Sequence, residues 1–424
     1  MSHARHACGL LLWALGLSAC QATAPWNAPT GPSQRLQATP RGQADPLSAI
    51  VRWKPGTSPN AVHTTLGGLR LTLRRHLPAL NASSVSWSSG AGPSAGLMAS
   101  GLVAAIEPNH IWRLSPRRAA PRALGFSLKQ AEDPGYAQRH WGQTRIGADR
   151  LWSQYRGAPR TLVAVIDTGI DLQHPDLRGA LVPGFTTFAE SSPQDYEGHG
   201  THVAGIIAGQ GSGQPGVRGV APDCRIMPIK VMGPRGREGR VENVVAGIIW
   251  AVDHGAQVLN MSLGDEGTSP LLRDAIRYAR ERDVVVVAAS GNFEEGRHAS
   301  TNTMNYPAAL PGVIAVGAVD DRENLADFSF WGHWLSVTAP GVDIHSSVPA
   351  DGDERGAYMS EQGTSMAAPF VAGVAALVRS RHPDWNAAQV QTRLEKTAHD
   401  LGAPGYDPRF GHGRLDAYRA VLGP

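Results

Sequence analysis

Apolar runs recur through the C-terminal two thirds of the chain and alternate with stretches of helical period. Five of these runs are short and bounded by turn-forming or polar residues, which predicts buried strands at 161–166, 225–231, 257–263, 284–289 and 313–319. Helical periodicity between them predicts helices, notably over 241–254 and 271–282. Strands that alternate with helices favour a parallel sheet with helices on both faces. Such an α/β fold binds ligands beyond the carboxyl ends of its strands.

The N-terminal end has a different pattern. An apolar run over 10–17 follows Arg5 and precedes small residues up to Cys20; it is too short to span a bilayer, and the layout is that of a signal peptide over 1–20. Residues 17–20 resemble the lipobox of bacterial lipoproteins, in which the cysteine is diacylated and becomes the new N-terminus. We therefore expect export with a lipid anchor on Cys20, and ordinary cleavage after Ala24 is the alternative.

A linker and a small domain follow the signal peptide. Residues 21–45 are rich in Pro, Gly, Gln and Thr and contain few large aliphatic residues, which predicts an unstructured linker. Alternating apolar positions at 49–53 and an apolar run at 101–106 predict two strands of a small domain over 46–115. The Ser- and Gly-rich stretch 83–100 indicates no regular element.

Charge is distributed unevenly along the chain. Residues 1–132 hold 13 lysines and arginines against 3 acidic residues, a net charge of +10, so the remainder carries −7 of the total of +3. A basic segment can bind nucleic acid, but the arginines at 113, 117, 118 and 122 are not interleaved with stacking aromatic residues. We therefore expect no nucleic-acid partner, and attraction between the two oppositely charged parts explains the asymmetry.

Three separate segments supply an aspartate, a histidine and a serine, namely Asp167, His199 and Ser365. In this order they match a known arrangement of orienting carboxylate, general base and serine nucleophile. Taken alone, Asp167 is consistent with a turn cap and Ser365 with a helix cap, but these explanations are poor for the set of three residues. A metal pair of His199 with His202 is disfavoured because no glutamate lies between them. The sequence Gly-Thr-Ser-Met-Ala around Ser365, which is not Gly-x-Ser-x-Gly, disfavours an esterase.

The segments 165–171, 198–205 and 363–369 closely resemble the signature segments of the subtilisin-like serine proteases, the subtilase or peptidase S8 family, and the resemblance extends over 133–424. It implies a subtilisin-like doubly wound parallel sheet and a serine endopeptidase that hydrolyses proteins and peptides through an acyl-enzyme intermediate. It also implies that 46–115 is an inhibitory propeptide domain of small, ferredoxin-like α+β fold and that 116–132 is a processing linker. The alternative for 46–115 is an accessory binding domain that stays attached.

The resemblance also implies further site residues. Asn292 is expected to donate a hydrogen bond to the oxyanion, beside the N-terminus of the helix that carries Ser365. Asn305 is expected near the floor of the pocket for the side chain before the scissile bond. Since no acidic residue is apparent there, we expect a preference for apolar or aromatic side chains. Two segments are expected to form the pocket walls: Ser262, Leu263 and Gly264, and Ala289, Ser290 and Gly291.

The chemistry requires no cofactor. Asp133 and Asp176 match acidic calcium ligands of the thermitase-like branch of the family, but the loop 209–216 lacks the usual asparagine, so calcium is expected only as an optional structural ion. The sequence thus predicts an exported serine endopeptidase, made as an autoprocessed zymogen and held at the membrane only through Cys20. A catalytically silent binding protein on the same fold, or an esterase, is the alternative.

Overall fold

The computed structural model describes residues 43–90, 92–114, 139–190, 192–212, 216–233, 237–293, 303–350 and 356–423. The predicted signal peptide with Cys20, the linker before residue 43, the processing linker 116–132 and the candidate ligand Asp133 lie outside the described residues. Within the described ranges, no helix has both the length and the apolar character needed to cross a membrane.

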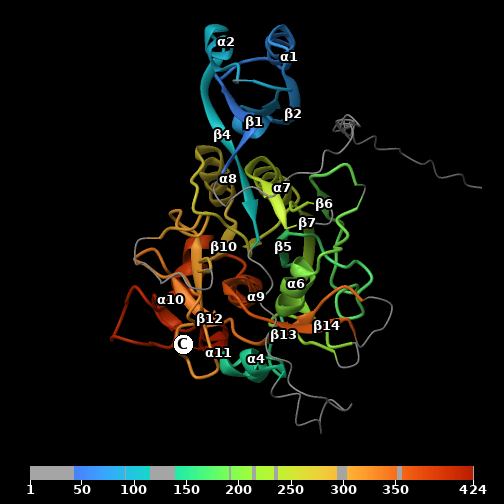
Figure 1. Cartoon of the computed structure of the whole chain (residues 1–424). Coiled ribbons are helices and arrows are strands. Elements are labelled where there is room, and N and C mark those ends of the chain that lie inside the picture. Colours follow the sequence, from blue (N-terminus) through green and yellow to red (C-terminus); the bar gives the residue numbers. More distant parts are fainter. Residues whose placement is uncertain are drawn as a thin grey trace, which may run out of the picture. The chain divides into compact units, whose positions relative to one another are not determined.

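A small α+β domain opens the described part of the chain (Figure 1). Its elements are β1 (Ala44–Trp53), α1 (Pro59–Gly68), β2 (Thr72–Leu77), η1 (Pro78–Leu80), β3 (Ala82–Ser86), α2 (Ser94–Ala99) and β4 (Val103–Arg113). The antiparallel strands lie in the order β2-β3-β1-β4, which is the ferredoxin-like arrangement. The predicted strands fall in β1 and β4, whereas the stretch 83–100 contributes to β3 and α2. Val51, Val62 and Leu97 belong to an apolar core of this domain's own.

The large domain is built on one seven-stranded sheet. Its strands are β5 (Leu162–Asp167), β6 (Phe185–Thr186), β7 (Arg225–Lys230), β9 (Val258–Met261), β10 (Val285–Ala289), β11 (Ile314–Val319) and β12 (Val337–Pro340). They lie in the order β12-β11-β10-β9-β5-β7-β6 and every pair is parallel. The predicted α/β fold class is thereby confirmed. The five predicted strands are β5, β7, β9, β10 and β11, while the two outermost strands, β6 and β12, were not predicted.

Helices cover both faces of this sheet. They are α4 (Trp141–Arg145), α5 (Ala148–Leu151), α6 (His199–Ala208), α7 (Val241–Asp253), α8 (Pro270–Glu281), α9 (Thr364–Arg381), α10 (Ala387–Thr397) and α11 (Ala417–Leu422). Alternate residues of β5 point to opposite faces. Val163 and Val165 belong to the apolar cluster that contains α6, α9, α10 and α11, whereas Ala164 and Ile166 belong to the cluster that contains α7 and α8.

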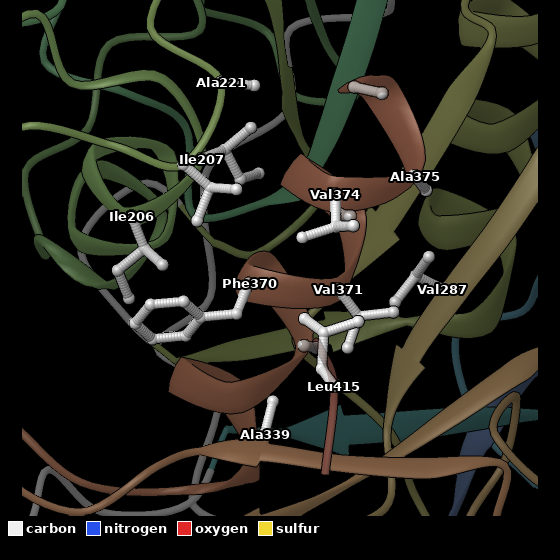
Figure 2. Packing of buried hydrophobic residues seen from close by; sticks show 14 of the residues in the cluster. Ile206, Ile207, Ala221, Val287, Ala339, Phe370, Val371, Val374, Ala375 and Leu415 are labelled. Atoms are coloured by element: carbon white, nitrogen blue, oxygen red, sulfur yellow. The ribbon is translucent and has the colours of Figure 1, made fainter. Parts of the chain in front are cut away.

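Helix α9 is the buried centre of the first cluster. Figure 2 shows the side chains of Phe370, Val371 and Val374 among those of Ile206 from α6 and Val287 from β10. A helix that is apolar on nearly all sides is stable only inside a core. Its packing against α6 therefore fixes the positions of both helices. The N-terminal ends of these helices carry two of the candidate catalytic residues.

The strand order of the sheet reverses at β5, which pairs with β7 on one side and β9 on the other. Because chain connections leave in opposite directions at such a point, a crevice forms at the carboxyl ends of the strands. Two shorter pairings border this region. Strand β13 (Ile344–Ser347) pairs with β14 (Tyr358–Glu361), which leads into α9, and β8 (Glu238–Arg240) pairs with β4 of the small domain.

Candidate active site

Asp167 and His199 form a hydrogen-bonded pair at the carboxyl edge of the sheet. Asp167 ends β5, and His199 opens α6 after Gly198, whose φ of 106° is a conformation that favours glycine. His199 Nδ1 lies 2.8 Å from Asp167 Oδ1, and both side chains are buried. Gly200 permits this approach, because a Cβ atom at that position would lie 2.1 Å from Gly169 O.

The surroundings of His199 suit it to act as a base. Burial lowers its pKa, but the charge and hydrogen bond of Asp167, together with the charge of Glu361, outweigh burial and the positive charge of Arg237, so the pKa of His199 lies above its ordinary value. An ionised carboxylate only accepts hydrogen bonds, so Nδ1 of the imidazole carries the proton. In the neutral ring Nε2 is then the acceptor that a general base requires.

Ser365 is the second residue of α9, where backbone N–H groups and the positive end of the helix dipole are concentrated. Its Oγ donates to Ser262 O at 3.0 Å, and Ser262 Oγ donates back to Ser365 O at 2.7 Å. Within the described residues, Ser365 Oγ makes no hydrogen bond to His199. Catalytic hydrogen bonds often tighten only when substrate is bound. The structure thus fixes the serine on the wall of the cleft and brings its helix against the helix of the histidine.

Asn292 is held by the residue that precedes the candidate nucleophile. Its Oδ1 accepts hydrogen bonds from Thr364 N at 2.9 Å and from Thr364 Oγ1 at 3.1 Å. Both donors bind the oxygen of the side-chain amide, so the orientation of the amide is set and its nitrogen lies on the other side. Thr364 was not among the predicted site residues, although its position beside Ser365 was a usable signal.

The predicted wall segments lie at the carboxyl ends of β9 and β10 and line a common hollow beside Ser365. Five of the six predicted wall residues line it together with the predicted floor residue; they are Ser262, Leu263, Gly264, Ala289 and Gly291, with Asn305 at the floor. Ser290 does not line the hollow. It is fully buried, and its Oγ donates to Phe330 O at 3.0 Å. Ala289 and Gly291 thus line the hollow, whereas the Ser290 side chain points away from it toward Phe330 O.

Several lining residues were not predicted. Asp265 and Glu266 directly follow the first wall, so acidic residues line this hollow beside the predicted floor. Phe330 closes one side of the hollow. Arg113 and Leu114 belong to the end of the small domain, far away in the sequence. Of these additional lining residues, only Asp265 and Glu266 could have been found from the sequence, because they directly follow the predicted wall residue Gly264.

Asp176, the candidate calcium ligand inside the described ranges, is fully buried. Its Oδ2 accepts a hydrogen bond from Val217 N at 2.6 Å, so one of its oxygens already has a backbone donor. In the described part of the chain, no three His, Cys, Asp or Glu side chains are grouped so that they could hold a metal ion. This donor set does not by itself fit a calcium site, and calcium binding stays a prediction.

A parallel sheet with this Asp–His pair and a serine at the start of a central buried helix defines a serine hydrolase of the subtilisin-like class. The subtilase family matches residues 159–413. The chain is 39% identical over 305 residues to a thermophilic serine proteinase from Bacillus sp. (strain AK1), with 72% of each chain covered. It is 44% identical over 284 residues to a subtilisin from Bacillus pumilus, with 66% of this chain and 98% of that protein covered.

A solved structure agrees with these relatives. Fervidolysin from Fervidobacterium pennivorans, a keratinolytic enzyme related to subtilisin, superposes with a TM-score of 0.75 and 30% sequence identity over 91% of this chain, which spans 62% of the fervidolysin chain. The chain belongs to the subtilase family and is a serine-type endopeptidase, as the sequence predicted.

Proposed function

We propose that the protein is an exported endopeptidase that cleaves proteins through Asp167, His199 and Ser365, with Asn292 as an oxyanion donor. The observation that carries this proposal is the buried 2.8 Å contact between His199 Nδ1 and Asp167 Oδ1, at the edge where the helices of His199 and Ser365 begin. Protein or peptide substrates would bind in the hollow beside Ser365 as an added strand.

The proposed reaction has two halves. Ser365 Oγ exchanges its hydrogen bond to Ser262 O for one to His199 Nε2, gives up its proton there and attacks the scissile carbonyl carbon. The oxyanion that forms is stabilised by the Asn292 amide and by N–H groups at the start of α9. When the C–N bond breaks, His199 returns the proton to the leaving amine. Water then hydrolyses the acyl-enzyme by the same steps, with His199 again as base.

We further propose that the small domain is an inhibitory propeptide. The end of its strand β4 pairs antiparallel with β8, with Trp112 opposite Gly239. Leu114 N donates to Arg237 O at 2.9 Å, and Leu114 also lines the hollow beside Ser365. A strand that continues into the cleft occupies the place that a substrate strand would need.

Ion pairs between the two domains support the same assignment. Arg74 Nε lies 3.2 Å from Glu242 Oε1, and Asp45 Oδ2 lies 2.9 Å from Arg240 Nε. In the first pair the small domain supplies the arginine, as the opposite net charges of the two parts of the sequence led us to expect, whereas in the second pair it supplies the carboxylate. Release of the domain would require a cut in the predicted processing linker 116–132.

The experiment that tests the proposal combines fluorophosphonate labelling, intact mass and casein hydrolysis on the full chain. The wild type should be labelled once, lose its N-terminal part and cleave casein. Ser365→Ala should do none of these and should accumulate uncut, whereas Ser153→Ala, a change of an exposed serine, should behave as wild type. A folded wild-type chain without labelling or casein hydrolysis would instead indicate a silent binding protein. Cleavage of lipid esters without cleavage of casein would indicate an esterase.

The proposed location depends on Cys20. Two acyl chains give stable membrane attachment, so the precursor should be found in the membrane fraction, and Cys20→Ser should release it. Cleavage within 116–132 would leave the mature enzyme free of the membrane, in the periplasm or medium. A wild-type precursor that is wholly soluble and begins at Pro25 would show that ordinary signal cleavage occurs.

Calcium, as an optional structural ion near Asp176, should raise the thermal unfolding midpoint if it binds.

A further inference from the structure

The side chain of Asn305 lines the hollow beside Ser365 at the place predicted for the pocket floor. This side chain is 5% exposed, and its Nδ2 donates to Ala289 O at 3.1 Å. It lies against both walls: a Cβ atom built on Gly264 would lie 2.2 Å from Asn305 Nδ2, and one built on Gly291 would lie 3.1 Å from Asn305 Cβ. The Asn305 amide therefore bridges the two walls.

The side of the hollow next to Gly291 is equally closed. A Cβ atom on Gly291 would lie 2.8 Å from Phe330 Cδ2, and the Phe330 ring packs against Phe293 with 4.1 Å between ring centroids. With Arg113 and Leu114 of the small domain in its lining, the hollow has a free volume of about 30 Å³. This is room for only a few water molecules, whereas a cavity that binds benzene measures ~150 Å³.

We propose that Asn305 shortens the pocket for the side chain before the scissile bond, so that the enzyme cleaves after short uncharged residues such as alanine and serine. The inference rests on the proposed function, because it requires this hollow to be the substrate pocket. It departs from the aromatic or large apolar preference expected from the sequence, since an aromatic ring would have to displace the Asn305 side chain. An acidic side chain is disfavoured as well, because Asp265 and Glu266 line the hollow.

Displacement of Asn305 would break its hydrogen bond and leave the Ala289 carbonyl without that donor. The loss of a buried hydrogen bond of this kind corresponds to a factor of about 10 to 100 in an equilibrium constant. We therefore expect kcat/KM for phenylalanine before the scissile bond to be lower than that for alanine by at least about tenfold. Asn305→Ala removes the amide that joins the two walls and should raise the ratio of kcat/KM for phenylalanine to kcat/KM for alanine by at least about tenfold.

The test uses the mature enzyme and a peptide series that differs only in the residue before the scissile bond: alanine, serine, leucine, phenylalanine or arginine. Mass spectrometry of digested casein reports the same preference without a chosen peptide. Met304→Ala is the matched control, because Met304 is adjacent in sequence, is 49% exposed and does not line the hollow. This change should leave all ratios as in the wild type.

The outcomes separate this inference from the proposed function. A protein that is not labelled by fluorophosphonate and leaves casein uncut refutes the proposed function and, with it, the pocket assignment. An active enzyme that cleaves after phenylalanine as fast as after alanine refutes the pocket inference alone. Preferred cleavage after arginine also overturns it and would assign Asp265 and Glu266 as the recognition groups. If Asn305→Ala does not fold, Asn305→Gly supplies the same test, and a labelled variant with unchanged ratios counts against the inference.

Discussion

Glu107 of β4 links the small domain to the start of helix α8. Its Oε2 accepts hydrogen bonds from Leu271 N at 3.0 Å and from Ser269 Oγ at 3.3 Å, and its Oε1 accepts one from Arg52 at 3.2 Å. Arg52 also pairs with Asp274 on the same helix. Both carboxylate oxygens thus face donors, and the charge lies at the positive end of the helix dipole.

The change Glu107→Gln removes this match while keeping the shape of the side chain. Glutamine offers one acceptor oxygen and one NH₂ group, so in either orientation its NH₂ meets Arg52 or Leu271 N, both of which are donors. A hydrogen bond to a charged group contributes about 1.5–3 kcal/mol, and a cost of ~2 kcal/mol corresponds to a factor of about 30. We expect the small domain to inhibit the mature enzyme about 30-fold less strongly.

The assay adds residues 43–114, which have their own apolar core, to the mature enzyme and measures the inhibition constant. Lys54→Gln is the control, because Lys54 is exposed and its Nζ bonds within the small domain. Glu107 is buried, so the ratio between wild type and Glu107→Gln should persist in 1 M salt, where exposed pairs are screened within about 3 Å. Equal inhibition by the two proteins, with circular dichroism showing both folded, would refute this account of the interface.

Three further changes test the site and the core. Asn292→Ala should lower kcat by about 10² to 10³, the magnitude known for this donor in a subtilisin, with little change in KM; an unchanged kcat would remove Asn292 from the oxyanion hole. The positive charge of Arg237 lowers the pKa of His199. Arg237→Gln should therefore raise that pKa further and move the acid limb of the pH profile of kcat/KM to higher pH. A shift of the acid limb to lower pH would contradict this effect of Arg237 on His199. Phe370 is fully buried, so Phe370→Ala should destabilise the domain by about 3–5 kcal/mol, seen as a lower thermal midpoint in the Ser365→Ala background, and an unchanged midpoint would contradict its core position.

The sequence predicted the elements that are long or strongly periodic. Helices expected at 241–254 and 271–282 are α7 and α8 within one residue at each end, because their apolar faces repeat with the helical period. Strand β6 has two residues and β12 ends in proline, so neither gives a run that stands out from a loop. In the small domain β3 reads Ala-Ser-Ser-Val-Ser, and two of its three serines, Ser83 and Ser84, are buried by pairing with β1 and β2 rather than by apolar character.

The candidate site could be predicted only where a residue's role is visible in its own segment. The order and neighbours of Asp167, His199 and Ser365 pointed to one site, and the structure brings the first two into contact. The orientation of Ser290 away from the hollow and the bridging position of Asn305 depend on Phe330 and Gly264, which are distant in sequence. Such positions follow from tertiary packing, and a single sequence carries no periodic signal for them.

The lack of a side chain at Gly200 is required both for the position of His199 and for the packing of α6 against β5. The α-carbon of Gly200 lies so close to Gly169 O that an added Cβ atom would stand 2.1 Å from it, and 3.1 Å from the Cβ atom of Asp167. A side chain at this position would push α6 away from β5 and lengthen the contact between His199 and Asp167. Because α6 is also packed against α9, that displacement would be passed to the helix of Ser365. The glycine next to His199 is therefore required by the approach of two elements, and the same approach sets the geometry of the contact between His199 and Asp167.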